Sequence, residues 1–190
     1  ADDLNQESVG DMTDTIRNLV PSYTATPLTG DGSSFVRSTS LRGLPPDNVL
    51  ILVNSKRRHR SALIQHFGAA MSSGSHAIDI GLIPSIALKS VEVLRDGASS
   101  QYGSDAIAGV VNFITRSDFE GFELSGKFQQ TSTGSQEDAT LGAIFGWGSE
   151  DGDSHFVIGG EFFDRGLLES KDRRDLTNNV YPLQNDTIVN

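Results

Sequence analysis

The stretch VEVLRDGASSQYGSDAIAGVVNFITR, residues 91–116, decides how the first part of this chain folds. It begins with an apolar run typical of a strand, passes through Gly, Ser and Asp residues typical of a loop, and ends in a second apolar run. Arg95 closes the first predicted strand and Arg116 closes the second. Gly97, Gly103 and Gly109 allow the tight or left-handed backbone that a sharp reversal needs.

The sequence before this stretch predicts short elements of both kinds. Apolar residues at helical spacing predict a helix over 9–20, which Pro21 ends. The continuous apolar run at 49–54 predicts a strand that is buried on both faces. Residues 97–105 read as a loop, and a helical turn is expected after Pro84. The other predicted strands are 35–42, 90–95 and 109–116. Residues 1–116 therefore predict a small α+β domain.

The charge of the chain is unevenly distributed. The total is −10, from 25 acidic and 15 basic residues. Residues 1–116 hold 11 acidic and 10 basic residues, and residues 117–190 hold 14 acidic and 5 basic residues. This change places a domain boundary near residue 117, and the acidic second part argues against nucleic-acid binding. The absence of Cys excludes disulfides and thiolate metal sites within this sequence.

After residue 117 the apolar residues alternate. Segments 121–131, 139–147 and 155–163 each place apolar side chains on one face and more polar ones on the other. Three such segments of about ten residues, separated by turn residues, are typical of a transmembrane β-barrel, with aromatic residues near strand ends. The alternative from the pattern alone is a soluble sandwich of amphipathic strands. Connections of different length and charge favour the barrel.

Residues 91–116 closely resemble the closing segment of the plug domain of TonB-dependent outer-membrane receptors. Further matches follow the order of that family: TDTIRNLVPSY, STSLRGLPPDNVLILVN and IDIGLIPSIALKSVEVLRDG. The resemblance covers roughly residues 8–116. It implies a plug at 1–116, a small mixed sheet with short helices, followed from 117 to 190 by the first antiparallel strands of an incomplete transmembrane barrel.

The family resemblance also implies a function. Such receptors lie in the bacterial outer membrane, bind a scarce ligand such as a ferric siderophore, and import it when a TonB-type inner-membrane complex acts on the plug. Three strands cannot close a barrel, so a fragment of a longer transporter is expected. The first residues, ADDLNQE, do not resemble the energy-coupling segment of the family. The alternative is a soluble periplasmic plug-like module that binds other envelope proteins.

Four charged residues occupy positions at which the resemblance implies contacts between plug and barrel. Arginines there would pair with carboxylates on the inner barrel wall through charge-assisted hydrogen bonds; the alternative is ordinary charges at strand ends. The predicted residues are Arg42, Glu92, Arg95 and Arg116. Glycines are expected to have structural roles at Gly43, Gly97, Gly103 and Gly109.

The run KRRHR, Lys56 to Arg60, is the densest basic patch. It either faces the ligand, where it would attract an anionic chelate, or forms a solvated loop beside the acidic barrel interior. The resemblance adds the loop residues at 101 and 102, although the tyrosine could equally pack beside Gly103. The candidate ligand-facing residues are Arg57, Arg58, His59, Gln101 and Tyr102.

The sequence carries no recognisable catalytic or metal-binding constellation. The four histidines, His59, His66, His76 and His155, are not paired at ligand spacing on any predicted element. No nucleophile–base pair, P-loop or paired acids suggest an enzyme. We therefore expect no catalytic residues, metal or cofactor, and the expected partners are the ligand, outer-membrane lipid and the energy-transducing complex.

Overall fold

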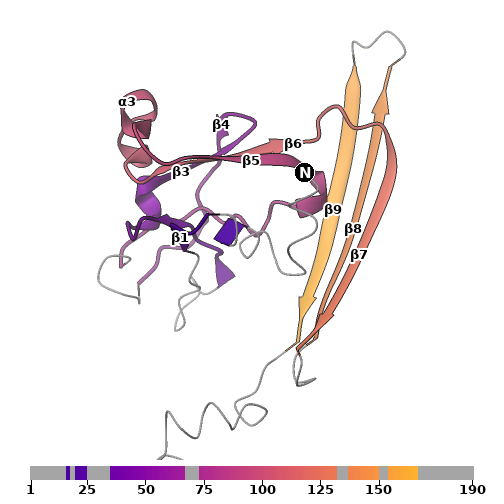
Figure 1. Cartoon of the computed structure of the whole chain (residues 1–190), viewed down its shortest axis with the longest axis horizontal. Coiled ribbons are helices and arrows are strands. Elements are labelled where there is room, and N and C mark those ends of the chain that lie inside the picture. The colour runs from indigo at the N-terminus through magenta and orange to yellow at the C-terminus, as the bar shows by residue number, and fades with distance from the viewer. Residues whose placement is uncertain are drawn as a thin grey trace, which may run out of the picture.

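The structure is a computed structural model that describes residues 16–17, 20–24, 35–66, 73–131, 137–149 and 154–166. Most of the helix predicted over 9–20 lies outside these residues, although Ile16 and Arg17 are helical and Val20 N donates to Ile16 O. Figure 1 shows two parts: an amino-terminal unit and, beside it, a tall curved sheet. No helix in the described part of the chain is long and apolar enough to cross a membrane.

A four-stranded sheet forms the centre of the amino-terminal unit. Its strand order is β4-β3-β6-β5, with β3 parallel to β6 and the other pairs antiparallel. The strands are β3 (Val49–Val53), β4 (Lys56–Arg57), β5 (Leu88–Leu94) and β6 (Gly109–Thr115). A separate two-stranded ladder joins β1 (Tyr23–Thr24) to β2 (Ser40–Leu41).

Both faces of this sheet are covered. Ile51, Val111 and Phe113 point into the main core, which also contains Ile16, Tyr23, Leu41 and Ile80. Leu50, Leu52 and Val110 point to the other face, where they pack against Ala98 and Ala106. This arrangement confirms the strand predicted at 49–54 as one buried on both faces, since the first four residues of β3 are all at most 4 % exposed.

Two predicted elements were wrong. The strand predicted over 35–42 is reduced to β2, because only Ser40 and Leu41 pair with β1. The loop predicted over 97–105 contains the helix α3 (Ala98–Tyr102) and the 3-10 turn η4 (Ser104–Ala106). Burial of Ala98 and Ala106 beneath the sheet favours these turns, and Gly97 and Gly103 on either side adopt positive φ. The turn expected after Pro84 is present as η3 (Ser85–Ala87).

The second sheet contains the three alternating segments. Its strands are β7 (Gly121–Gln130), β8 (Glu137–Gly148) and β9 (His155–Arg165), all antiparallel in the order β7-β8-β9. These strands confirm the three predicted strands. β8 and β9 extend beyond the alternating segments predicted at 139–147 and 155–163. Opposed residues lie on one face, as in the row Phe122, Phe145 and Ile158.

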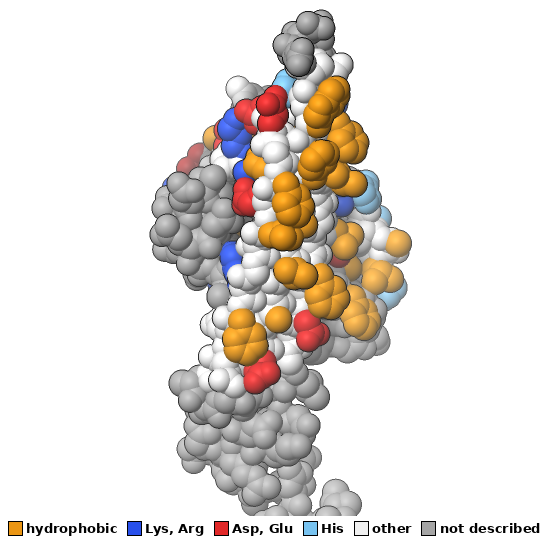
Figure 2. All heavy atoms as spheres, turned by 90° about the vertical axis from the view of Figure 1, so that its right-hand side faces the viewer, with side chains coloured by type: hydrophobic (Ala, Val, Ile, Leu, Met, Phe, Trp, Pro, Cys, Tyr) orange, Lys and Arg blue, Asp and Glu red, His pale blue; other side chains and the backbone are white. Residues whose placement is uncertain are grey.

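Figure 2 shows the apolar side chains of this sheet as a continuous band on the face turned away from the amino-terminal unit. These side chains are between 46 % and 68 % exposed. They are Phe122, Leu124, Phe128, Leu141, Phe145, Trp147, Phe156, Ile158 and Phe162. An exposed apolar surface of this extent is unusual for a soluble protein and indicates contact with lipid or another apolar partner.

Candidate functional site

The amino-terminal unit contacts the inner face of the β7–β9 sheet through the turn η3. Ile86 is 4 % exposed and lies over Gly142 of β8, where an added Cβ would be 3.4 Å from the Ile86 side chain. At Gly159 of β9 an added Cβ would be 3.6 Å from the Cβ of Ala87. A methyl group at either position would make ordinary van der Waals contact with the turn, so η3 lies directly over the main chain of both strands.

Two carboxylates of the sheet border this apolar contact. Arg116 Nη2 donates to Glu123 Oε2 at 2.8 Å, while Arg116 Nη1 donates to the carbonyl oxygen of Ile86. On the other side, the hydroxyl of Ser85 donates to Glu161 Oε2. The Arg116 guanidinium also lies 4.2 Å from the centre of the Phe119 ring, a cation–π contact. One arginine therefore joins η3 to the sheet.

Residues 117–120 connect Arg116, the residue after β6, to β7. At this connection Lys89 Nζ of β5 donates to Asp118 Oδ2 at 3.0 Å, and this hydrogen bond lowers the pKa of the Asp118 carboxyl below its ordinary value. The main chain of Phe119 lies directly against Gly146 of β8, where an added Cβ would be 1.9 Å from the Phe119 carbonyl oxygen. This close approach requires glycine at position 146.

Two of the other residues predicted to meet the barrel, Arg42 and Glu92, pair within the amino-terminal unit. Arg42 Nη1 donates to the Asp96 carboxylate and to the carbonyl oxygen of Arg95, both at 2.9 Å. Glu92 accepts a hydrogen bond from Asn112 Nδ2. Among the four predicted residues, only Arg116 forms an ion pair with the described strands β7–β9. A role for Arg42, Glu92 and Arg95 against further strands remains a prediction.

We expect the Arg116–Glu123 pair to couple the two parts of the chain by about 0.5–1 kcal/mol, since the side chains are 23 % and 40 % exposed. A double-mutant cycle of Arg116→Ala and Glu123→Ala, measured as thermal unfolding of the full-length protein that contains this chain, would give this value. Arg116→Lys is the matched control, because it keeps the charge but loses the planar fork. Additive single effects would contradict a direct coupling.

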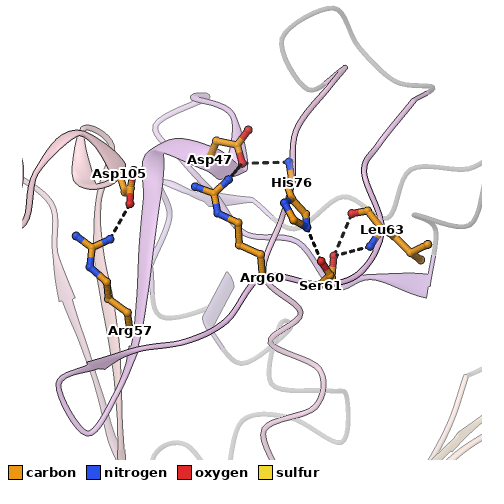
Figure 3. Close-up of polar contacts among 7 residues, drawn as sticks. All are labelled: Asp47, Arg57, Arg60, Ser61, Leu63, His76 and Asp105. Atoms are coloured by element: carbon orange, nitrogen blue, oxygen red, sulfur yellow. Dashed lines mark hydrogen bonds and ion pairs between the residues drawn. The ribbon is translucent and has the colours of Figure 1, made fainter.

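Two residues of the basic run form ion pairs inside the unit. Figure 3 shows Arg57 against Asp105 and Arg60 against Asp47. Arg57 Nη1 lies 2.6 Å from Asp105 Oδ2, and its Nη2 donates to the carbonyl oxygen of Tyr102. These contacts fix Arg57 to α3 and η4. Gln101 and Tyr102 lie on α3, and their side chains are exposed.

A serine, a histidine and an aspartate meet near the base of the loop that follows Arg60 (Figure 3), but not as a catalytic triad. The His76 ring contacts the carbonyl oxygen of Ser61, and Asp47 accepts from the main-chain N–H of His76. A triad requires hydrogen bonds between the side chains of all three residues. Asp47 instead holds two chain segments together through Arg60 and His76.

An open hollow of about 470 Å³ lies beside this loop. Its apolar lining includes Phe35 and Leu82, which are 80 % and 68 % exposed. Arg58 and His59 supply basic groups, and the Arg58 guanidinium forms no ion pair with the described residues. This volume suits a small ligand. Among the described residues, no group of three or more His, Asp or Glu is placed to hold a metal ion.

The model of the TonB-dependent receptor plug domain matches residues 1–110. The chain belongs to the TonB-dependent receptor plug family. It is 34 % identical over 142 residues to an iron-regulated outer membrane virulence protein of Vibrio cholerae, covering 74 % of this chain and 20 % of that protein. It is 38 % identical over 82 residues to the probable TonB-dependent siderophore receptor PirA of Acinetobacter baumannii, covering 42 % of this chain and 10 % of PirA.

Among solved structures, the plug and its neighbouring sheet resemble a mutant of the ferric enterobactin receptor PfeA from Pseudomonas aeruginosa. The TM-score is 0.63 at 19 % sequence identity, covering 86 % of this chain and 23 % of the PfeA chain. At this identity the likeness concerns the fold alone. The chain therefore spans about a fifth of the Vibrio relative and about a quarter of the PfeA chain.

Sequence reasoning missed three polar residues at the contact between plug and sheet: Ser85, Glu123 and Glu161. A signal for the two glutamates was present, because both occupy the polar face of an alternating strand, which must point toward the plug if the apolar face meets lipid. Ser85 gave no signal of its own. Its role depends on the turn after Pro84 meeting β9, which only the tertiary structure specifies.

Proposed function

We propose that this chain is the amino-terminal part of a TonB-dependent outer-membrane receptor that imports a scarce ligand such as a ferric siderophore. Residues 1–116 would form the plug that gates the passage, and residues 117–190 would begin the barrel. The exposed apolar face of β7–β9, with the plug packed on the opposite face, is the observation that supports this function most strongly.

The length of that apolar face agrees with the thickness of the apolar part of a membrane. Outward apolar residues of β8 run from Ala139 to Trp147, about 27 Å along the strand at the usual rise. With the tilt of barrel strands this covers roughly 20 Å of depth, comparable with the apolar band of about 25 Å in such barrels. A soluble periplasmic module, the alternative, would have to leave this whole face in water, so we do not favour it.

Connection lengths suggest which end of the sheet faces outward. The segment 149–154 joins β8 to β9 at one end. At the other end the segment 131–136 joins β7 to β8, and the long charged sequence GLLESKDRRDLTNNVYPLQNDT follows β9. Outer-membrane barrels have short periplasmic turns and long extracellular loops. Phe35 and Leu82, which line the hollow beside Arg58, also line a second hollow together with Glu161 and Phe163 near that second end of β9. Both residues would therefore lie toward the outside.

The ligand would then meet the apolar hollow with Arg58 and His59 at its edge. This lining suits an anionic chelate with apolar groups, and the names of the Vibrio, Acinetobacter and Pseudomonas relatives point to iron uptake. The energy would come from a TonB-type inner-membrane complex that acts on the plug. This proposal involves no catalysis, cofactor or nucleic acid; outer-membrane lipid would surround the barrel.

Uptake of ⁵⁵Fe by cells that carry the full-length receptor, and no other iron receptor, tests the proposal with a panel of ferric chelates. We expect import of at least one chelate that stops when an ionophore collapses the proton gradient, while binding to the cells persists. A protein that binds none of the chelates, or imports them without the gradient, would contradict the proposed function.

A second arm tests the ligand surface. Arg58→Glu should weaken binding of an anionic ferric chelate about tenfold, because a charge-assisted contact contributes about 1.5 kcal/mol or more. Lys56→Glu makes the same charge change in the same basic run but lies outside the hollow, and should leave binding nearly unchanged. Equal losses in both variants would indicate a general charge effect instead of a site.

A further inference from the structure

We propose that the hollow beside Arg58 selects ferric chelates by their charge: it takes chelates that present apolar groups and carry at most one negative charge. Asp47 sets this limit, because it neutralises Arg60 at the edge of the hollow. This selection rests on the import function proposed above and specifies the class of its ligand. It makes Asp47 a specificity-determining residue, although Asp47 does not line the hollow itself.

The surface of the hollow is mainly apolar. Phe35, Leu63 and Leu82 line it and are 80 %, 41 % and 68 % exposed. These residues come from three segments that are separated in the sequence, and the fold brings them together around one space. Large apolar side chains that surround a hollow in this way indicate a ligand that covers them with apolar groups of its own.

The charged side chains around this surface balance one another. Arg58, Arg60 and Asp79 line the hollow. Asp47 adds a second carboxylate, whose Oδ1 accepts a hydrogen bond from Arg60 Nη1 at 3.0 Å. Asp79 Oδ1 accepts from the main-chain N–H of Gly81 at 3.0 Å, which holds that carboxylate in place. With histidine counted as neutral, the two arginines and the two aspartates carry no net charge.

Asp47 also fixes the position of Arg60 (Figure 3). The same Oδ1 atom accepts the main-chain N–H of His76 at 3.0 Å, from the far side of the loop that Arg60 precedes. A main-chain hydrogen bond of 2.9 Å, from Ser61 N to the carbonyl oxygen of Ala77, closes the stem of this loop. Arg60 is therefore held at the stem, where its charge is cancelled before a ligand arrives.

A single uncompensated cation can match a single negative charge of the ligand. Arg58 supplies that cation, since it forms no ion pair with the described residues whereas Arg60 does. Each additional negative charge would lose its water in the apolar hollow without gaining a partner, and the Asp79 carboxylate would repel it. An uncharged chelate avoids both costs, so it should bind more tightly than a highly charged chelate of the same shape.

Two tripodal chelates built on the same scaffold test this selection with the purified full-length receptor. Fe³⁺ held by three hydroxamates is uncharged, whereas Fe³⁺ held by three catecholates carries three negative charges. Their dissociation constants are measured by quenching of the protein fluorescence, at about pH 8 so that imidazole groups stay uncharged. We expect the wild type to bind the hydroxamate chelate about tenfold more tightly than the catecholate chelate, or better.

Asp47→Asn isolates the charge of Asp47. The amide oxygen can still accept from Arg60 and from His76 N, so the loop should stay closed. The variant should also fold, because the side chains of the Arg60–Asp47 pair are 41 % and 36 % exposed and such pairs contribute little to stability. We expect its affinity for the catecholate chelate to rise about fivefold, less at high salt, and its affinity for the hydroxamate chelate to stay within about twofold.

Two further variants complete the test. Asp96→Asn makes the same charge change in the exposed Arg42–Asp96 pair, which does not line the hollow, and should leave both affinities unchanged. Asp47→Asn combined with Arg60→Gln restores the charge balance, and should return the ratio of the two affinities to its wild-type value.

The proposed selection would be overturned if Asp47→Asn left the ratio unchanged, shifted it no more than Asp96→Asn, or weakened both chelates equally, which would give Asp47 a structural role alone. A wild type that prefers the catecholate chelate, or that imports other ferric chelates but binds neither probe, would also overturn it. A wild-type receptor that imports no ferric chelate at all would instead defeat the proposed function.

Discussion

Leu141→Arg should largely prevent assembly of the full-length receptor in the outer membrane, whereas Thr140→Arg should be tolerated. Leu141 is 60 % exposed on the outer face near the middle of β8, and its neighbours across the sheet are Gly126 and Phe162. An arginine on the lipid face near the bilayer midplane costs about 2–4 kcal/mol. Thr140, the preceding residue, points to the inner face, where a charge meets a polar lumen.

Folded and unfolded receptor can be separated on a gel run in cold detergent, because folded barrels resist unfolding under these conditions. We expect the folded fraction of Leu141→Arg to fall several-fold below that of Thr140→Arg. Similar losses in both variants would mean that the faces are reversed or that β8 is not in lipid. Leu141→Ala serves as a further control, because it removes the side chain without adding a charge.

The three strands of the second sheet could be predicted because alternation is a local property of the sequence. Each strand has period two, and the pattern itself states which residues share a face. The pattern could not predict where each strand ends. Glu137, Asp138 and Arg165 belong to strands only because they pair with neighbours, and the Arg165–Asp138 ion pair is made across the ladder.

The helix α3 could not be predicted from its sequence. Five residues, ASSQY, are far too few for an isolated helix, and the flanking glycines are typical of a loop. The helix forms because Ala98 fits beneath Leu50, Leu52 and Val110. The contacts with Leu50 and Leu52 join residues that are 48 and 46 positions apart in the sequence, and helix propensity contains no information about them.

The positions of the arginines could be predicted, but not their partners. The resemblance places Arg42, Arg95 and Arg116 at strand ends, and the structure has them there or close by. Arg116 meets Glu123, seven residues later, because the connection 117–120 turns directly into β7. Arg42 instead meets Asp96, and this depends on how β2 lies beside the loop after β5.

Gly109→Ala should unfold or displace the plug within an otherwise assembled receptor. Gly109 begins β6 with a φ of +143°, and an added Cβ would lie 2.5 Å from the carbonyl oxygen of Leu94 and 3.1 Å from Leu41. Backbone of this kind costs a side chain about 1–3 kcal/mol, and the collision with the main chain of β5 adds to this cost. We expect a destabilisation of about 3 kcal/mol or more.

Two further glycines make the result interpretable. Gly43 has a φ of +73° but open space around it, so Gly43→Ala should cost only the backbone strain of about 1–2 kcal/mol. Gly126→Ala lies in β7 with open space, and should be nearly neutral. Thermal unfolding of the purified receptor, and entry of a large antibiotic that an intact plug excludes, should both rank the variants in this order. If Gly109→Ala destabilised the receptor no more than Gly43→Ala, β5 would have shifted to accept the methyl group. The close approach of β5 and β6 would then not be what stabilises this part of the plug.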